Sequence, residues 1–159
     1  MSEHVKPPRP YPRVSPMLTV EGAAQAIEFY KRAFAAVERD MRLTTPDGKI
    51  LHAELDFDGS IITIADAMPG WGIMAPDEAI PPSVRMALAV DDAQTWFDRA
   101  VEAGAEVLIA LGEQYYGHRS GRLRDPFGHV WVISQDVEGL DRTEMQRRTT
   151  AMFEGAGDV

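Results

Sequence analysis

The sequence predicts an α+β fold built from two modules of the same order: strand, helix and three strands. Three observations support this prediction. The hydrophobic pattern of the first half recurs in the second, turn sequences rich in Gly, Pro and Asp separate the strands, and a connector rich in Gly, Pro and Met lies between the halves. We therefore place the modules at residues 13–66 and 83–137, with the connector at 67–82, in one domain spanning residues 13–137.

In the first module, apolar side chains recur at helical spacing between Glu21 and about Ala35, which predicts a helix. Turn sequences at residues 45–48 and 58–59 bound the strands that follow. We expect four strands here, at Val14–Val20, Val37–Thr44, Ile50–Phe57 and Ser60–Ala65.

In the second module, Asp91 and Asp92 are suited to cap a helix that ends at about Ala103. The turn Asp125–Gly128 joins a Pro with fixed φ to a Gly that tolerates positive φ, and Asp125 can cap its own backbone. We expect strands at Ser83–Val90 and Glu106–Ala110, a loop or wide turn at Gln114–Ser120, and then a hairpin that ends in the strand Val130–Ile133. Because that last strand is apolar on both faces, it should be covered on both.

The two halves align in a constant register. Residues 15–20 fall on residues 85–90, which matches Leu18 with Leu88, and the last strands match Thr63 with Val132. A duplicated module of this kind normally supplies half of a core or half of a site.

Two segments lie outside the repeat. Residues 1–12 form a Pro-rich N-terminal arm, and residues 138–159 form a C-terminal helix and tail, with the helix at about Leu140–Phe153 and Asp141 or Thr143 as its cap. The helix carries few apolar residues, so it must dock on its own domain or across a two-fold axis, and we favour the two-fold. Exposed strand edges also indicate a homodimer.

Composition restricts the classes of function. The chain has 159 residues, no cysteine and a formal net charge of −9, with a pI of about 4.8. The lack of cysteine excludes thiol catalysis, thiolate metal sites and disulfides. The acidity argues against nucleic acid as a partner and reflects either solubility or attraction of a cationic ligand. No apolar run reaches membrane-span length and no signal peptide is evident, so we expect a cytoplasmic protein without a membrane partner.

The repeat, together with the turn Asp125-Pro126-Phe127-Gly128-His129 and the helix opening Ala26-Ile27-Glu28-Phe29-Tyr30, resembles the vicinal oxygen chelate superfamily. That superfamily includes glyoxalase I, extradiol dioxygenases, and fosfomycin- and bleomycin-resistance proteins. The resemblance covers residues 13–136. It implies a curved mixed sheet around a cavity shared by the modules, helices on the outer face, and dimers.

Enzymes of this superfamily place metal ligands on the first and last strands of each module. Carried onto this chain, those positions are Ser15, Thr63, Arg85 and Val132. Ser and Thr hydroxyls are weak ligands, Val offers none and Arg repels a cation. The resemblance therefore implies a retained fold without the metal site, and no cofactor is expected.

Other residues are candidates for ligand contact or for substitute chemistry. Arg85 should point inward and be paired, either with a ligand anion or with an internal carboxylate such as Glu54. His52 and Glu54 share one strand face, as a metal or acid–base pair or as a polar pair facing solvent or a dimer partner, and strict alternation favours the second interpretation. His118 lies in a predicted loop, where it gates or protonates a ligand or is simply exposed. Aromatic and Met side chains offer an adaptable apolar wall or ordinary packing, so the full ligand-binding set is Ser15, Met17, Thr63, Trp71, Arg85, Tyr115, Tyr116 and Val132.

Three functions follow from these observations. The favoured one is a glyoxalase/bleomycin-resistance-like protein that binds a small organic ligand in the inter-module cavity without a metal and without transforming it. The alternative is a metal-dependent lyase, isomerase or dioxygenase with relocated ligands at His52, Glu54 and His118. The third is a structural or regulatory protein whose cavity is filled by side chains.

Overall fold

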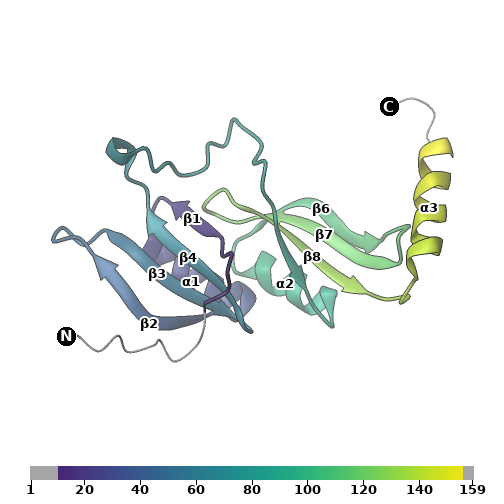
Figure 1. Ribbon diagram of the computed structural model, residues 1–159, viewed down its shortest axis with the longest axis horizontal. Coiled ribbons are helices and arrows are strands. Elements are labelled where there is room, and N and C mark those ends of the chain that lie inside the picture. The colour runs from purple at the N-terminus through teal and green to yellow at the C-terminus, as the bar shows by residue number, and fades with distance from the viewer. Residues whose placement is uncertain (1–10, 156–159) are drawn as a thin grey trace. The chain divides into compact units, whose positions relative to one another are not determined.

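The structure is a computed structural model that describes residues 11–155, and Figure 1 shows its elements. The chain divides into two compact units. The first comprises residues up to 31 and residues 35–75, and the second comprises residues 32–34 and residues from 76 onward. Each unit holds its own four-stranded mixed sheet, so the predicted α+β fold of two βαβββ modules is confirmed. The shared cavity stays a prediction.

The first unit has a sheet with the strand order β1-β4-β3-β2. Its first and last strands pair in parallel, and the other neighbours pair antiparallel. The elements are β1 (Met17–Val20), α1 (Ala23–Phe34), β2 (Val37–Thr44), β3 (Ile50–Phe57) and β4 (Ser60–Asp66).

Helix α1 buries one apolar face in the core of this unit. Ile27, Phe29 and Tyr30 are almost fully buried, and the Tyr30 ring meets Phe57 of β3 edge to face. No residue next to the helix caps its start with a side chain. Instead the Asp66 carboxylate, at the end of β4, accepts hydrogen bonds from the backbone N–H groups of Gly22 and Ala23.

The connector that follows contains one short turn of 3-10 helix, η1 (Pro69–Trp71). An isolated bridge between Met68 and Ile73 closes this segment. The connector is therefore locally ordered, as its Gly and Pro content allows.

The second unit repeats the arrangement with the strand order β5-β8-β7-β6. Its first and last strands are again the parallel pair. The elements are β5 (Met86–Ala89), α2 (Ala93–Glu102), β6 (Glu106–Glu113), β7 (His118–Arg124), β8 (Val130–Asp136) and α3 (Arg142–Gly155).

The start of α2 is capped in two ways. Asp92 accepts hydrogen bonds from the backbone N–H and the hydroxyl of Thr95, as predicted. The side chain of Gln135, on the last strand, accepts a hydrogen bond from the N–H of Ala93. Gln135 stands where Asp66 stands in the first unit, so both modules fasten the helix start to the last strand.

The Asp125 carboxylate organises the turn between β7 and β8, and only 3% of the residue is exposed. One carboxylate oxygen accepts the N–H groups of Phe127 and His129, both at 2.9 Å. The other accepts the indole N–H of Trp131, also at 2.9 Å. Gly128 closes the turn at φ 94°, a conformation that favours glycine.

The pairing registers confirm the internal repeat. Met17 pairs with Thr63 in the first unit, and Ala87 pairs with Val132 in the second. These are the residues that the sequence alignment matched. Each module therefore sets the same positions of its first and last strands side by side.

Some predicted boundaries were wrong. The predicted loop or wide turn at Gln114–Ser120 is a narrower turn, closed by a hydrogen bond from the N–H of Gly117 to the carbonyl of Gln114. Strand β7 begins at His118, so His118 lies on a strand and not in a loop. The last strand is not covered evenly, because Trp131 and Ile133 are buried whereas Val132 is half-buried.

The C-terminal helix α3 begins after Asp141, whose carboxylate accepts the N–H of Glu144, so Asp141 is the cap of the two predicted candidates, Asp141 and Thr143. Arg148 ties the helix to its own unit through Glu138 and the carbonyl of Tyr115. No residue of α3 is buried. Across residues 11–155, no helix has both the length and the apolar character needed to span a membrane.

We predict that Asp125→Ala destabilises the fold by about 2–4 kcal/mol, because three N–H donors, one of them the buried indole, lose their acceptor. Asp56→Ala is the matched control, since Asp56 occupies the equivalent turn but accepts the Gly59 N–H in an exposed setting. It should cost about 1 kcal/mol. Urea denaturation measures both, and equal losses would contradict this role for Asp125.

Candidate functional site

Each sheet has one face packed against its helix and one open face. In the first unit Leu18, Leu55 and Ile64 are buried in the core. Because side chains alternate along a strand, Met17, Glu54 and Thr63 point to the opposite, open face. The predicted metal and ligand positions belong to this face and to its counterpart in the second unit.

On the open face of the first unit, four side chains form a cluster around Glu54, here called the Glu54 cluster: Tyr11, Arg39, His52 and Glu54. Glu54 is only 3% exposed. Its carboxylate accepts hydrogen bonds from the Tyr11 hydroxyl at 2.8 Å and from Arg39 Nη1 at 2.8 Å, and His52 Nε2 lies 3.2 Å away. The Arg39 guanidinium also sits 5.0 Å from the centre of the Tyr11 ring, a cation–π contact.

The cluster shifts the pKa values of both acids within it. Desolvation raises the pKa of Glu54, but hydrogen bonds from Tyr11 and His52 and the charge of Arg39 outweigh it, so this pKa lies below its usual range. The hydrogen bond to Glu54 is the main cause that raises the pKa of the Tyr11 phenol. Glu54 is therefore an anion at neutral pH.

The favoured interpretation of His52 and Glu54, a polar pair that faces solvent or a dimer partner, was wrong for Glu54. An exposed pair facing solvent or a dimer partner was expected, but Tyr11 and Arg39 cover the carboxylate. Alternation along one strand identified the face correctly and missed these two partners. Residues 1–10 of the predicted N-terminal arm lie outside the described residues.

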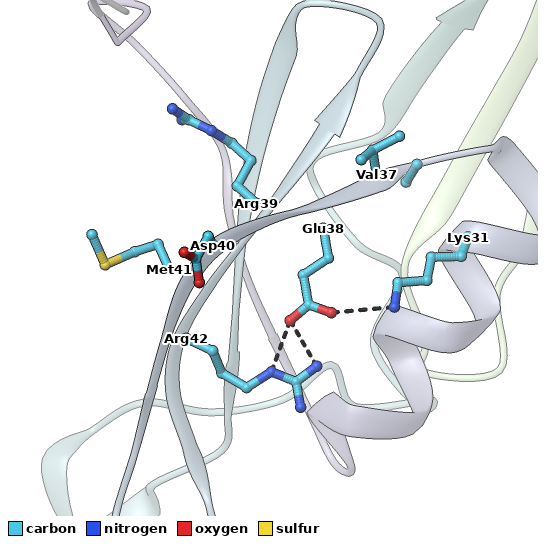
Figure 2. A pocket seen from close by; sticks show the side chains of 8 residues that line it. Lys31, Val37, Glu38, Arg39, Asp40, Met41 and Arg42 are labelled. Carbon is cyan, nitrogen blue, oxygen red and sulfur yellow. Dashed lines mark hydrogen bonds and ion pairs between the residues drawn. The ribbon is translucent and has the colours of Figure 1, made fainter. Parts of the chain in front are cut away.

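The first unit also has a hollow of about 690 Å³, which lies along β2 and the end of α1 (Figure 2). In this hollow Glu38 forms ion pairs with both Lys31 and Arg42. Figure 2 shows the Arg39 side chain pointing away from this group. None of the predicted site residues lines this hollow. Its main charges satisfy one another, so we do not place the functional site there.

The open face of the second unit contains a small pocket of about 100 Å³. It includes two predicted ligand contacts, Tyr116 and Val132, and five residues that the sequence did not indicate. We call it the Arg122 pocket, and its lining residues are Ile109, Gln114, Tyr116, Ser120, Gly121, Arg122 and Val132.

The floor of the Arg122 pocket depends on Gly121. A Cβ atom on this residue would lie 2.5 Å from the Phe97 ring of α2, and 3.0 Å and 3.1 Å from the β6 backbone at Leu111 and Ile109. Glycine therefore lets α2 and β6 approach β7, which positions Ser120 and Arg122 on the opposite, open face.

The other predicted ligand contacts occupy varied environments. The Ser15 hydroxyl is buried and has no hydrogen-bond partner among the described residues, whereas Met17 and Trp71 are 75% and 74% exposed. Tyr115 packs edge to face on Tyr116, and the His118 ring lies close to Tyr116 with its Nδ1 2.9 Å from Ser134 Oγ. Tyr116, His118 and Ser134 are thus neighbours in the second unit.

The predicted burial of Arg85 and its pairing with Glu54 were wrong, whereas its contact with a ligand anion stays a prediction. Strand β5 begins only at Met86, and Arg85 precedes it as an exposed residue. The suggested partner, Glu54, is bound by Arg39 instead.

The four positions expected to hold metal in this fold do not offer a suitable donor set. Thr63 and Val132 lie on the inner strands β4 and β8 and face the open side of each sheet, whereas Ser15 and Arg85 precede the first strands. One guanidinium, one aliphatic side chain and two hydroxyls cannot supply the charged oxygen or imidazole ligands of a divalent cation. Within residues 11–155, no three His, Asp or Glu side chains gather in a group able to hold a metal ion.

Sequence reasoning missed Tyr11, Arg39 and Arg122. Tyr11 and Arg39 reach Glu54 from the arm and from β2, and no local pattern links them. Arg122 had a detectable signal, because it pairs with Val132 as Glu54 pairs with Thr63. Extending the repeat to the third strand of each module would have found it.

A family model described as Glyoxalase/Bleomycin resistance protein/Dioxygenase superfamily matches residues 13–133. The chain belongs to this superfamily. An uncharacterised protein of Mycobacterium bovis is 40% identical over 147 residues, covering 91% of this chain and 96% of the relative. The superfamily assignment therefore covers both modules.

Two solved structures share the fold of this chain. The Arabidopsis thaliana At5g48480 product is 27% identical with a TM-score of 0.62, covering 79% of this chain and 99% of that chain. The fosfomycin resistance protein FosX of Listeria monocytogenes, solved with Mn(II) and sulfate, has a TM-score of 0.62 at 13% identity, covering 82% and 96%. The second likeness shows the fold alone.

We predict that Glu54→Gln lowers the free energy of unfolding at pH 7 by about 1–3 kcal/mol, because Arg39 loses its anionic partner. Since the folded-state pKa of Glu54 lies below its ordinary value of 4.5, its contribution is present above that value and disappears as pH falls through the folded-state pKa. The difference between wild type and variant should therefore shrink in acid.

The control is Glu113→Gln, which breaks an exposed ion pair with Arg119 and should change stability by about 0.5 kcal/mol or less. Denaturant titrations from neutral to acidic pH test both variants. A Glu54→Gln penalty that does not depend on pH would refute the electrostatic role.

Proposed function

We propose that this protein is a glyoxalase/bleomycin-resistance-like binding protein that holds a small organic ligand against its open sheet faces without a metal. The observation that carries the proposal is the donor set: Ser15, Thr63, Arg85 and Val132 stand where superfamily enzymes hold their metal. No reaction of a chelated substrate can be assigned to these side chains.

The surfaces of the open faces support ligand binding. Tyr116, Ile109 and Val132 offer aromatic and aliphatic walls around the Arg122 pocket. Trp71 and Met74 are exposed on the connector, where an aromatic ring and a flexible thioether can adapt to a flat ligand.

The alternative is a metal-dependent lyase, isomerase or dioxygenase with relocated ligands. The contact between His52 and Glu54 favours it, since an imidazole and a carboxylate side by side are typical metal ligands. The ion pair between Glu54 and Arg39 opposes it, because the guanidinium competes with a cation for the carboxylate.

Metal analysis of the untagged protein separates the two functions. We expect less than stoichiometric divalent metal after dialysis, and no shift of the melting temperature when Mn²⁺ or Zn²⁺ is added. A stoichiometric metal that is lost in His52→Ala would refute the proposal and support the alternative. His118→Ala, a variant in the other unit, reports whether that histidine belongs to the same metal site.

We also propose a homodimer. The edge strand β2 exposes Val37 and Leu43, and α3 exposes Met152 and Phe153. Unpaired strand edges with apolar side chains favour association with a second copy.

Light scattering at micromolar concentration should therefore give about twice the chain mass of 17.6 kDa. A chain truncated after Gly139 tests the contribution of α3. A monomeric mass for the full chain would refute the dimer, and a dimer that survives truncation would place the interface elsewhere, on strand edges such as β2.

A further inference from the structure

Strand β7 carries three arginines, and the neighbouring edge strand β6 neutralises only two of them. Arg119 forms an ion pair with Glu113 at 2.8 Å, and Arg124 forms one with Glu106 at 3.5 Å. Arg122 lies between them in the sequence. Its cross-strand partners are Ile109 on β6 and Val132 on β8, whose side chains can neither accept a hydrogen bond nor form an ion pair.

The side chain of Arg122 has no ion pair or hydrogen bond within the described part of the chain, and its Nε–H is buried without an acceptor. A buried guanidinium N–H that lacks an acceptor is costly, and arginines in such settings usually bind a carboxylate or a phosphate. The chain has 25 acidic and 16 basic residues, yet no acidic side chain pairs with Arg122 within the described residues.

The residues around Arg122 suit an anion. None of the seven lining residues of the Arg122 pocket is acidic. Ser120 adds a hydroxyl, whereas Ile109, Tyr116 and Val132 supply apolar and aromatic walls. The equivalent residue of the first unit, Glu54, is already satisfied by Tyr11, Arg39 and His52, so the two open faces differ in what they can accept.

We infer that Arg122 binds the anionic group of the ligand, a carboxylate or a phosphonate-type group, with the planar fork of its guanidinium. A volume of about 100 Å³ accommodates such a head group but not a whole organic ligand, whose sites typically measure about 300–1,000 Å³. The remainder of the ligand extends over the apolar open face beside Tyr116 and Val132. This inference rests on the proposed small-molecule binding and names the chemical class of the ligand.

The test uses benzoate and phenylphosphonate as probes, with benzamide as the uncharged match for benzoate. The readout is the Nε–H resonance of Arg122 in ¹H–¹⁵N spectra of the full chain, assigned by its loss in Arg122→Gln. We expect benzoate or phenylphosphonate to shift this resonance, with a Kd on the order of 1 mM as for other fragments. The stronger of the two identifies the anion as a carboxylate or a phosphonate.

Variants separate the guanidinium fork from charge alone. Because they lack the Arg122 Nε–H, their affinities are measured from the backbone amide shifts of Ser120 and Gly121, which line the same pocket. Arg122→Gln should lower the affinity for the anionic probe about tenfold or more. Arg122→Lys should restore part of that affinity, because a lysine keeps the charge but not the planar fork. Arg124→Gln is the matched control on the same strand and should change the affinity by less than about twofold, since Arg124 already has a partner. Thermal melts establish that each variant is folded.

The outcomes distinguish this inference from the proposed function. Benzamide binding as tightly as benzoate, unchanged in Arg122→Gln, would overturn anion recognition and leave small-molecule binding intact. Absence of any shift at the Arg122 Nε–H with either anion would overturn the inference as well. Stoichiometric metal in a protein whose benzoate affinity still depends on Arg122 would overturn the metal-free function and support the inference.

Discussion

The parallel pairing of the first and last strands is the constraint on which each module depends. It joins β1 to β4 and β5 to β8, elements separated by a helix and two further strands. Once that register is set, alternation decides which side chains meet the helix and which form the open face. The side chains of Asp66 and Gln135 reinforce it, because each fastens the start of its helix to the last strand.

The two modules share this frame and differ in charge. At equivalent cross-strand positions the first unit carries Glu54, and the second carries Arg122. Glu54 is covered by Tyr11 and paired with Arg39, so its charge is used within the protein. The cross-strand partners of Arg122 are the apolar residues Ile109 and Val132, and its guanidinium Nε–H is buried without an acceptor among the described residues. The charge of Glu54 is thus balanced within its own unit, whereas the guanidinium Nε–H of Arg122 is not satisfied by its own unit.

Much of this site was visible in the sequence before any coordinates. The residues at the superfamily's metal positions could be named because the resemblance implies them and the repeat matches them between the modules. The pairing of Met17 with Thr63 and of Ala87 with Val132 confirmed that alignment. The error at Arg85 arose because β5 is shorter than its apolar pattern suggested. The error at Glu54 arose because its partners come from Tyr11 and β2, at distances along the chain that no periodicity connects.

The sequence by itself determined the fold, the order of the elements, the helix caps at Asp92 and Asp141, and the Asp125 turn, because these depend on local hydrogen bonding and on hydrophobic periodicity. Only the tertiary structure decided which charges are satisfied. Ion pairing depends on distances between side chains on different strands, and β6 provides carboxylates to Arg119 and Arg124 but places Ile109 opposite Arg122. That choice is made by strand register, which no single segment encodes.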